Sequence, residues 1–267
     1  MRIIDVHTHA FPDALAERAI AELADRCGCR PAGDGTVAGL VEAMDAAGVE
    51  VSVICSIATQ PAHVGSILRW CVAARSDRVL PLASVHPETP DAGGWVRRVG
   101  EAGVPGIKLH TMYQDFRPDD WSRMDAIYAA AAEVDLVITF HAGMDFGWPA
   151  DDDRASPVRL ARVHERFPDL RMICSHMGAW RMWDLSREHL VGRGGELMLE
   201  TSYSLDQIGP DVAARMIRRH GVDRVMFGTD WPWARPIDSL RHFERLGLTD
   251  EEKAAVLGGT AQRVYGI

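Results

Sequence analysis

The stretch "IIDVHTHAFP" at residues 3–12 joins an apolar run to two histidines placed one residue apart. The β-branched residues at its start predict a buried strand. Because side chains alternate along a strand, Asp5, His7 and His9 are expected to point to one face. An acid and two imidazoles are costly to bury unless something binds them. The two histidines are therefore either hydrogen-bonded residues at a strand end or half of a metal site.

Short apolar runs alternate with amphipathic or alanine-rich segments from this stretch to the end of the chain. Strands are predicted at 2–7, 51–56, 79–85, 106–110, 135–141, 171–176, 196–201 and 223–229. Helices are predicted between them at 36–48, 62–76, 91–102, 119–134, 156–166, 181–190, 210–220 and 238–246. Strands that are each followed by a helix, about thirty residues apart, are typical of a (β/α)8 TIM barrel. A doubly wound open sheet is the alternative, although it more often has fewer strands.

The length also suits a barrel. At 267 residues the chain is long for one average domain but normal for one α/β barrel, so we predict a single domain over residues 1–267. Residues 10–35 are predicted to form a long first loop, functional or mobile. Residues 249–265 are predicted to form two short helices that close the barrel.

Composition limits the classes of partner. The net charge is −9 and no basic run is present, so we expect no nucleic-acid partner. No stretch approaches the ~18 apolar residues of a spanning helix, so we expect no membrane association. The N-terminus enters a strand directly, and we expect no signal peptide. Five cysteines without framework spacing suit a reducing compartment, so we predict a cytoplasmic protein.

Two of these cysteines, Cys27 and Cys29, flank one glycine and could bind metal. No second Cys/His pair lies near them in the sequence, which favours a loop turn as the explanation.

Polar residues gather at the predicted carboxyl ends of the strands, where barrels of this class place their chemistry. Five of the eleven histidines lie there, with Lys108 and Asp230; the five are His7, His9, His110, His141 and His176. A single histidine at such a place is well explained as a core residue, but this many at one rim are not. A shared divalent metal accounts for them together, since imidazoles and a carboxylate suit zinc, manganese or iron.

Other residues keep two interpretations. Asp5 either supports the histidines or pairs elsewhere in the core. His86, at the end of the third strand, is undecided. The histidines inside helical segments are expected to be solvated or to cap helices; these are His63, His164, His189, His220 and His242.

Five of the eight tryptophans follow strands of the expected site, namely Trp148, Trp180, Trp183, Trp231 and Trp233. They either anchor loops or form a flat wall for a cyclic or aromatic substrate. Cationic side chains near them would hold a substrate carboxylate, and the candidates are Lys108, Arg117, Arg181 and Arg235.

The motifs "DVHTHAFP", "GIKLH", "ITFHAG", "ICSHMG" and "FGTDWPW" together resemble the amidohydrolase superfamily. The likeness covers nearly the whole chain, includes the closing "LGGTAQRVYGI", and is nearest to the amidohydrolase-related branch that contains aminocarboxymuconate-semialdehyde decarboxylase. It implies a metal-dependent barrel enzyme whose metal ligands are His7, His9, His141 and Asp230. The chain is shorter than the larger decarboxylases, so their inserted substrate loops and dimer contacts are not carried over.

The resemblance also implies that His176 faces the substrate and shuttles protons or polarises it. Lys108 stands where dinuclear relatives carry a carboxylated, metal-bridging lysine. Because the branch is usually mononuclear, we expect one metal, with Lys108 free to bind an anionic substrate.

The leading hypothesis is a metal-dependent hydrolase that activates a metal-bound water against a C–N or C–O bond of a small, cyclic or carboxylated substrate. Its catalytic residues are Asp230 and His176, and zinc is the first choice of metal, before manganese or iron. The expected substrate contacts are Lys108, His110, Trp148, Arg181 and Trp231. A non-oxidative decarboxylase or hydratase on the same site is the alternative. A binding protein on a degenerate barrel would have lost a ligand position, and none is lost. Whether the chain forms a homo-oligomer is left open.

Overall fold

The computed structural model describes residues 2–267, and it contains all eight predicted strands. They are β1 (Ile4–Thr8), β2 (Val51–Cys55), β3 (Val79–Leu82), β4 (Gly106–Leu109), β5 (Val137–Phe140), β6 (Met172–Cys174), β7 (Leu197–Glu200) and β8 (Val225–Met226). Every pairing between them is parallel, and every strand residue is buried. Strands buried on both faces are expected where helices cover the outside of a parallel sheet.

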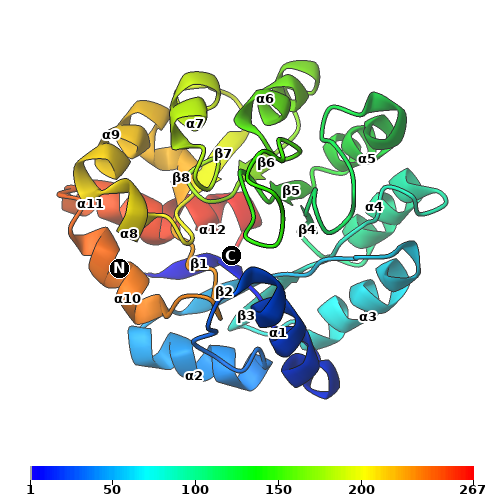
Figure 1. Cartoon of the computed structure of the whole chain (residues 1–267), viewed down its shortest axis with the longest axis horizontal. Helices are drawn as coiled ribbons and strands as arrows, with labels where there is room; N and C mark the ends of the chain where they lie inside the picture. The colour runs from blue at the N-terminus through cyan, green and yellow to red at the C-terminus, as the bar shows by residue number, and fades with distance from the viewer. Residues whose placement is uncertain (1) are drawn as a thin grey trace.

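The strands form a ring of two hydrogen-bonded sheets, β1-β2-β3 and β4-β5-β6-β7-β8. At one seam the Lys108 amide donates to the Ala83 carbonyl at 2.8 Å. At the other seam the Val6 amide donates to the Phe227 carbonyl at 2.9 Å. Figure 1 shows the helices arranged around this ring. The predicted TIM barrel is confirmed.

The eight predicted helices are present as the outer layer. They are α2 (Val37–Ala47), α3 (Val64–Ala74), α4 (Ala92–Glu101), α5 (Trp121–Glu133), α6 (Pro157–Arg166), α7 (Trp183–His189), α9 (Pro210–His220) and α10 (Pro236–Glu244). Local chemistry sets several of their ends: the Thr36 hydroxyl accepts from the Gly39 amide at the start of α2, and Gly48 ends it in the left-handed conformation. Short elements η1 (Pro61–His63), α8 (Leu205–Ile208) and η2 (Val222–Arg224) fill the connections.

The prediction of a first loop over residues 10–35 is wrong in one respect, because this segment contains the helix α1 (Asp13–Cys27). Its alanine and glutamate residues favour a helix, and Gly28 ends it in the left-handed conformation. Only Ala16 and Ile20 of α1 are fully buried, so the helix lies on the barrel instead of inside its core. In Figure 1 it is the dark blue helix that lies in front of β2 and β3.

The C-terminal segment closes the amino end of the barrel. Helices α11 (Asp250–Ala254) and α12 (Thr260–Tyr265) are the two predicted short helices, and the π-helical segment η3 (Ala255–Gly259) joins them. Val264 and Tyr265 of α12 pack in one apolar cluster with strand residues such as Ile4. The opposite, carboxyl end of the barrel is therefore the end that is left for a site.

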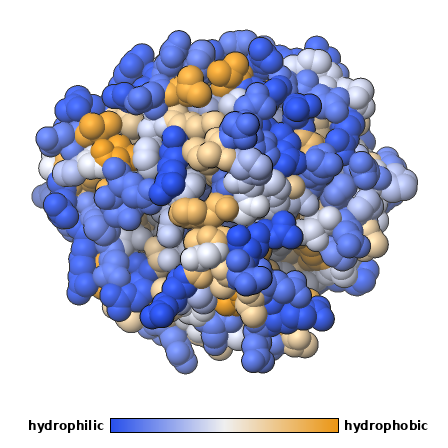
Figure 2. All heavy atoms as spheres, in the orientation of Figure 1, coloured by the Kyte–Doolittle hydropathy of each residue, from blue (hydrophilic) through white to orange (hydrophobic). Residues whose placement is uncertain are grey.

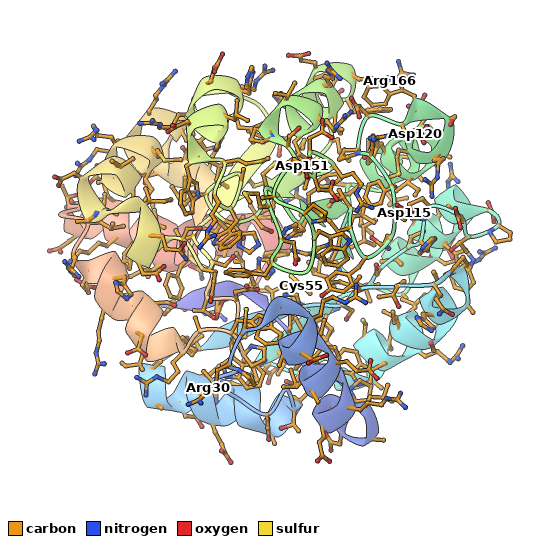
Figure 3. All side chains as sticks on the ribbon, viewed as in Figure 1. Arg30, Cys55, Asp115, Asp120, Asp151 and Arg166 are labelled. Atoms are coloured by element: carbon orange, nitrogen blue, oxygen red, sulfur yellow. The ribbon has the colours of Figure 1, made fainter. Side chains whose placement is uncertain are left out.

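Polar side chains cover most of the surface, and apolar atoms gather in the middle of the face shown in Figure 2. The side chains of Figure 3 place Cys55 near the centre of the view and Arg166 at its outer edge. No helix within residues 2–267 is long and apolar enough to cross a membrane.

Candidate metal centre

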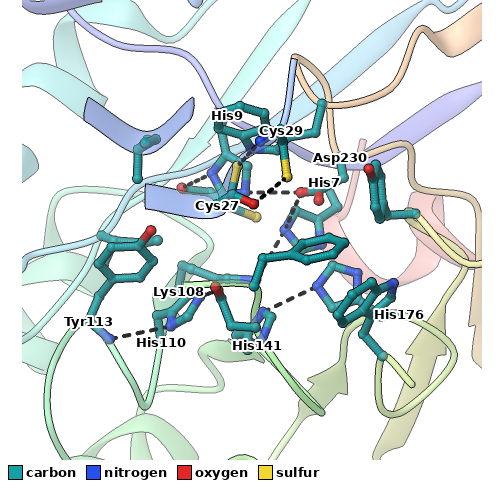
Figure 4. A pocket seen from close by; sticks show the side chains of 18 of the residues that line it. His7, His9, Cys27, Cys29, Lys108, His110, Tyr113, His141, His176 and Asp230 are labelled. Carbon is teal, nitrogen blue, oxygen red and sulfur yellow. Dashed lines mark hydrogen bonds and ion pairs between the residues drawn. The ribbon is translucent and has the colours of Figure 1, made fainter. Parts of the chain in front are cut away.

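Three of the four predicted ligands meet at the carboxyl end of the barrel (Figure 4). One oxygen of Asp230, Oδ1, lies 3.1 Å from His9 Nε2 and 3.4 Å from His7 Nε2. The Asp230 amide donates to the His7 carbonyl at 2.8 Å, so the pairing of β1 with the chain after β8 sets this distance.

In both histidines, the hydrogen-bond partner of Nδ1 determines whether Nε2 carries a proton. His7 Nδ1 lies 2.9 Å from the Glu200 carboxylate, and His9 Nδ1 lies 3.0 Å from the Cys55 carbonyl. Both partners only accept, so each Nδ1 carries the proton and each Nε2 directs a lone pair at Asp230. Lone pairs facing a carboxylate oxygen at 3.1–3.4 Å are favourable when a cation lies among them. Ligands about 2.1 Å from one tetrahedral ion are spaced in this way, so the residues fit a divalent metal.

The fourth predicted ligand, His141, lies beside this group and not within it. Its Nδ1 lies 3.2 Å from His176 Nε2, while its Nε2 donates to the Met144 carbonyl at 3.1 Å. His176 Nδ1 donates to the Ser202 carbonyl at 3.0 Å. Both facing nitrogens therefore lack a proton of their own in the neutral rings, and the pair is suited to share a proton or a cation.

Glu200 is a candidate site residue to which the sequence analysis assigned no role. It is fully buried at the end of β7, and it accepts from His7 Nδ1, from the His176 amide at 2.9 Å and from the Ser202 amide at 2.6 Å. It therefore orients two of the predicted site histidines. The sequence carried a signal for it, because Glu200 ends a predicted strand on the same face as Ser202.

Asp5 supports the backbone of the site. Its carboxylate accepts from the His7 amide at 3.1 Å and from the Thr229 amide and hydroxyl at 3.0 and 2.5 Å. Burial raises its pKa to about 7. Of its two predicted roles, these contacts favour support of the site, because they join β1 to the segment carrying Asp230.

Lys108 lies on the floor of the site and is fully buried. Its Nζ lies 3.1 Å from His7 Nε2 and 3.2 Å from the Ser175 hydroxyl. Burial lowers its pKa. Lys108 also lines the cavity of the site, and its contact with a substrate stays a prediction.

A cavity of about 190 Å³ opens above these residues. Five side chains expected at the site line it together with Asp230 and His7; they are His9, Lys108, His110, His141 and His176. Aromatic side chains supply much of the remaining wall, and these are Phe11, Tyr113, Phe146, Trp180, Tyr203 and Trp233.

Three predicted substrate contacts lie outside the lining of this cavity. Trp231 is only 1% exposed and packs in a core cluster with Leu40 and Met44 of α2. Trp148 packs edge-on against Tyr113 and lines a groove that adjoins the cavity. Arg181 lies over the ring of Trp180, 4.5 Å from its centroid. Trp180 and Trp233, not Trp231 and Trp148, form the tryptophan part of the wall.

Cys27 and Cys29 also border the cavity, from the end of α1. The Cys29 amide donates to Cys27 Sγ at 3.1 Å across the left-handed Gly28. Neither thiol belongs to a group of three metal-ligating side chains within residues 2–267. The turn expected from the sequence accounts for the pair.

A family model described as amidohydrolase matches residues 4–267. The chain belongs to the amidohydrolase family. The resemblance stated from its motifs is therefore confirmed, and this amidohydrolase-family chain is an enzyme of the metal-dependent superfamily. No curated protein matches it in sequence.

Solved structures share the fold of this family member over its whole length. An uncharacterized TIM-barrel protein from Bordetella bronchiseptica has a TM-score of 0.76 at 20% identity, covering 100% of this chain and 99% of that one. 5-Carboxyvanillate decarboxylase from Novosphingobium aromaticivorans was solved in complex with manganese and 4-hydroxy-3-methoxy-5-nitrobenzoic acid. It has a TM-score of 0.75 at 17% identity, covering 100% of this chain and 96% of that one. A putative 2-pyrone-4,6-dicarboxylic acid hydrolase from Pseudomonas putida has a TM-score of 0.69 at 20% identity, covering 99% of this chain and 97% of that one. At these identities the likeness establishes the fold.

Proposed function

We propose that this protein is a metal-dependent hydrolase that opens a C–N or C–O bond of a small cyclic substrate. The observation that carries the proposal is the group of His7, His9 and Asp230, in which two lone pairs and a carboxylate oxygen converge. His141 is proposed as the fourth ligand. Zinc is the first choice of metal, and manganese, which the structurally similar decarboxylase binds, is the second. A bound divalent metal supplies Lewis acidity and lowers the pKa of water.

The chain's own residues account for the movement of protons. The side chain of Asp230 is 13% exposed toward the cavity, so it can accept a proton from the attacking water and deliver it to the leaving group. When its ring is protonated, His176 Nε2 is placed to donate a hydrogen bond to a substrate carbonyl and stabilise negative charge on its oxygen. The bond from His176 Nδ1 to the Ser202 carbonyl holds that ring in position.

A second candidate function is non-oxidative decarboxylation on the same residues. The observation that favours it is the amine of Lys108, which lies 3.1 Å from His7 Nε2 and is suited to hold a substrate carboxylate there. Both reactions use the same ligands, and they differ in the fate of water.

The test is turnover in water enriched in ¹⁸O, using the zinc-loaded protein and a panel of lactones, cyclic amides and ring carboxylates. Incorporation of ¹⁸O into a ring-opened product supports the hydrolase. Release of CO2 without incorporation supports the decarboxylase and overturns the hydrolase. Protein stripped by a chelator and the D230N variant are the controls, and turnover that survives in both contradicts any role for the metal group.

A further inference from the structure

One wall of the cavity carries a fixed carboxylate that the proposed reaction does not use. Asp145 follows β5 and lines the cavity beside His110. Its Oδ2 lies 3.2 Å from His110 Nε2, and its Oδ1 accepts from the Gly147 amide at 2.9 Å. Both oxygens are therefore anchored, and the carboxylate is held in one orientation.

His110 leaves the charge of this carboxylate in place. Its Nδ1 accepts from the Tyr113 amide at 3.5 Å, so the neutral ring donates its Nε2 proton to Asp145. The ring stacks on His141 with centroids 4.1 Å apart and is buried. A neutral imidazole orients Asp145 without neutralising it, so this wall presents a negative charge.

Few cationic side chains line the cavity itself, although Arg26 lies over the ring of Tyr113 and Arg181 over that of Trp180. Within residues 2–267, Lys108 is the one lysine or arginine that lines it, and its Nζ already contacts His7 and Ser175 on the floor. The arginines expected to hold a substrate carboxylate, Arg117, Arg181 and Arg235, do not line it. A second negative group on a substrate would therefore face Asp145 without a counter-charge, which costs binding energy.

The cavity suits one ring at the metal end, and it adjoins a wider groove with which it shares Phe11 and Tyr113. A cavity of about 150 Å³ accommodates benzene. The volume here, about 190 Å³, leaves room for one six-membered ring with small substituents. The aromatic side chains of the wall suit a flat ring.

We propose that Asp145 is a specificity-determining residue that selects a single-ring substrate. The selected substrate carries at most one negative group, which lies at the metal end, and a hydrogen-bond donor at the other end, next to Asp145. The inference deepens the proposed function and rests on it, because it takes this cavity as the substrate site. It excludes ring dicarboxylates as good ligands.

The test compares two probes of one shape, 3-hydroxybenzoate and isophthalate, which differ in carrying a donor or a second carboxylate at the same ring position. Their affinities for the zinc-loaded protein are measured by calorimetry near neutral pH. We expect 3-hydroxybenzoate to bind at least about tenfold more tightly. The isosteric D145N variant should reduce this preference to within about threefold, since the amide still pairs with His110 but carries no charge.

The D151N variant is the matched control, because Asp151, labelled in Figure 3, lies on the same loop, is exposed and does not line the cavity. It should keep the wild-type preference. Equal or tighter binding of isophthalate, an unchanged preference in D145N, or no binding of either probe overturns the proposal. Binding needs no turnover, so a protein that discriminates but incorporates no ¹⁸O disproves the reaction alone, and one that hydrolyses without discriminating disproves the specificity alone.

Discussion

Two buried histidines, one in the helical shell and one at the barrel mouth, use their ring nitrogens differently. His220 ends α9, and its Nδ1 accepts from the Gly192 amide at 3.2 Å while its Nε2 donates to the Leu197 carbonyl at 3.1 Å. His7 donates from Nδ1 to Glu200, whereas its Nε2 carries a lone pair that faces Lys108 and Asp230. The two are equally hidden from solvent, at 0% and 1% exposure. The difference shows that the partner of the second nitrogen, and not burial, separates a structural histidine from a candidate ligand.

The largest effect is expected from a substitution of Asp230, whose carboxylate faces the lone pairs of His7 and His9. D230N keeps the size of the side chain but removes the charge that faces the two lone pairs. Metal polarisation is worth several kcal/mol, so turnover should fall by about 1000-fold. Elemental analysis should find less than one metal per chain, with D151N as a control that keeps it. A variant with full metal content and full rate would show that Asp230 is not a ligand.

The next effect concerns the structural histidine. Burial lowers the pKa of His220 to about 4 from 6.5, so the neutral form stabilises the fold. This contribution is fully present above pH 6.5 and is lost as the pH falls through about 4. A pKa difference of this size between the folded and unfolded states corresponds to about 3 kcal/mol of stability. Urea unfolding at pH 7 and pH 4 should show that wild type loses about this much more stability than H220Q, whose amide does not titrate. Equal losses would mean that His220 does not titrate on unfolding.

A smaller effect is expected from the residue that orients His7. E200Q keeps an acceptor but removes the charge, and the loss of an outer-shell partner typically weakens metal binding by 10–100-fold. Zinc affinity can be measured by competition with a chromophoric chelator. The S202A variant, which removes only one hydroxyl next to Glu200, should weaken binding less. If zinc affinity is unchanged in E200Q, Glu200 has a structural role and does not contribute to metal binding.

The smallest effect is expected at a histidine that is neither buried in the fold nor a candidate metal ligand. His189 in α7 is partly exposed, and its ion pair with Glu188 spans 3.7 Å. H189Q should change the free energy of unfolding by less than about 0.5 kcal/mol and leave the metal content as it is. A larger loss would mean that partly exposed histidines of the shell also carry stability.

Local sequence patterns predicted the barrel and most of the rim. A strand of period two ending in His7 and His9, and others ending in His141, His176 and Asp230, can be recognised from a few consecutive residues. The helix α1 was missed because it lies on the barrel with few buried residues, so its apolar pattern is weak. His220 was expected to be solvated or to cap a helix, and the expectation of solvation was wrong, because the side chain is buried. Its hydrogen-bond partners, Gly192 and Leu197, are distant in sequence, so local patterns do not reveal them.

The sequence by itself determined which side chains stand at the carboxyl ends of the strands, because alternation along a strand is a local property. Only the tertiary structure decided which nitrogen of each imidazole is free, that Glu200 orients His7, and that Trp233 lines the cavity while Trp231 is buried against α2. These outcomes depend on atoms brought together from opposite ends of the chain. Short-range periodicity does not encode such contacts, and closure of the ring creates them.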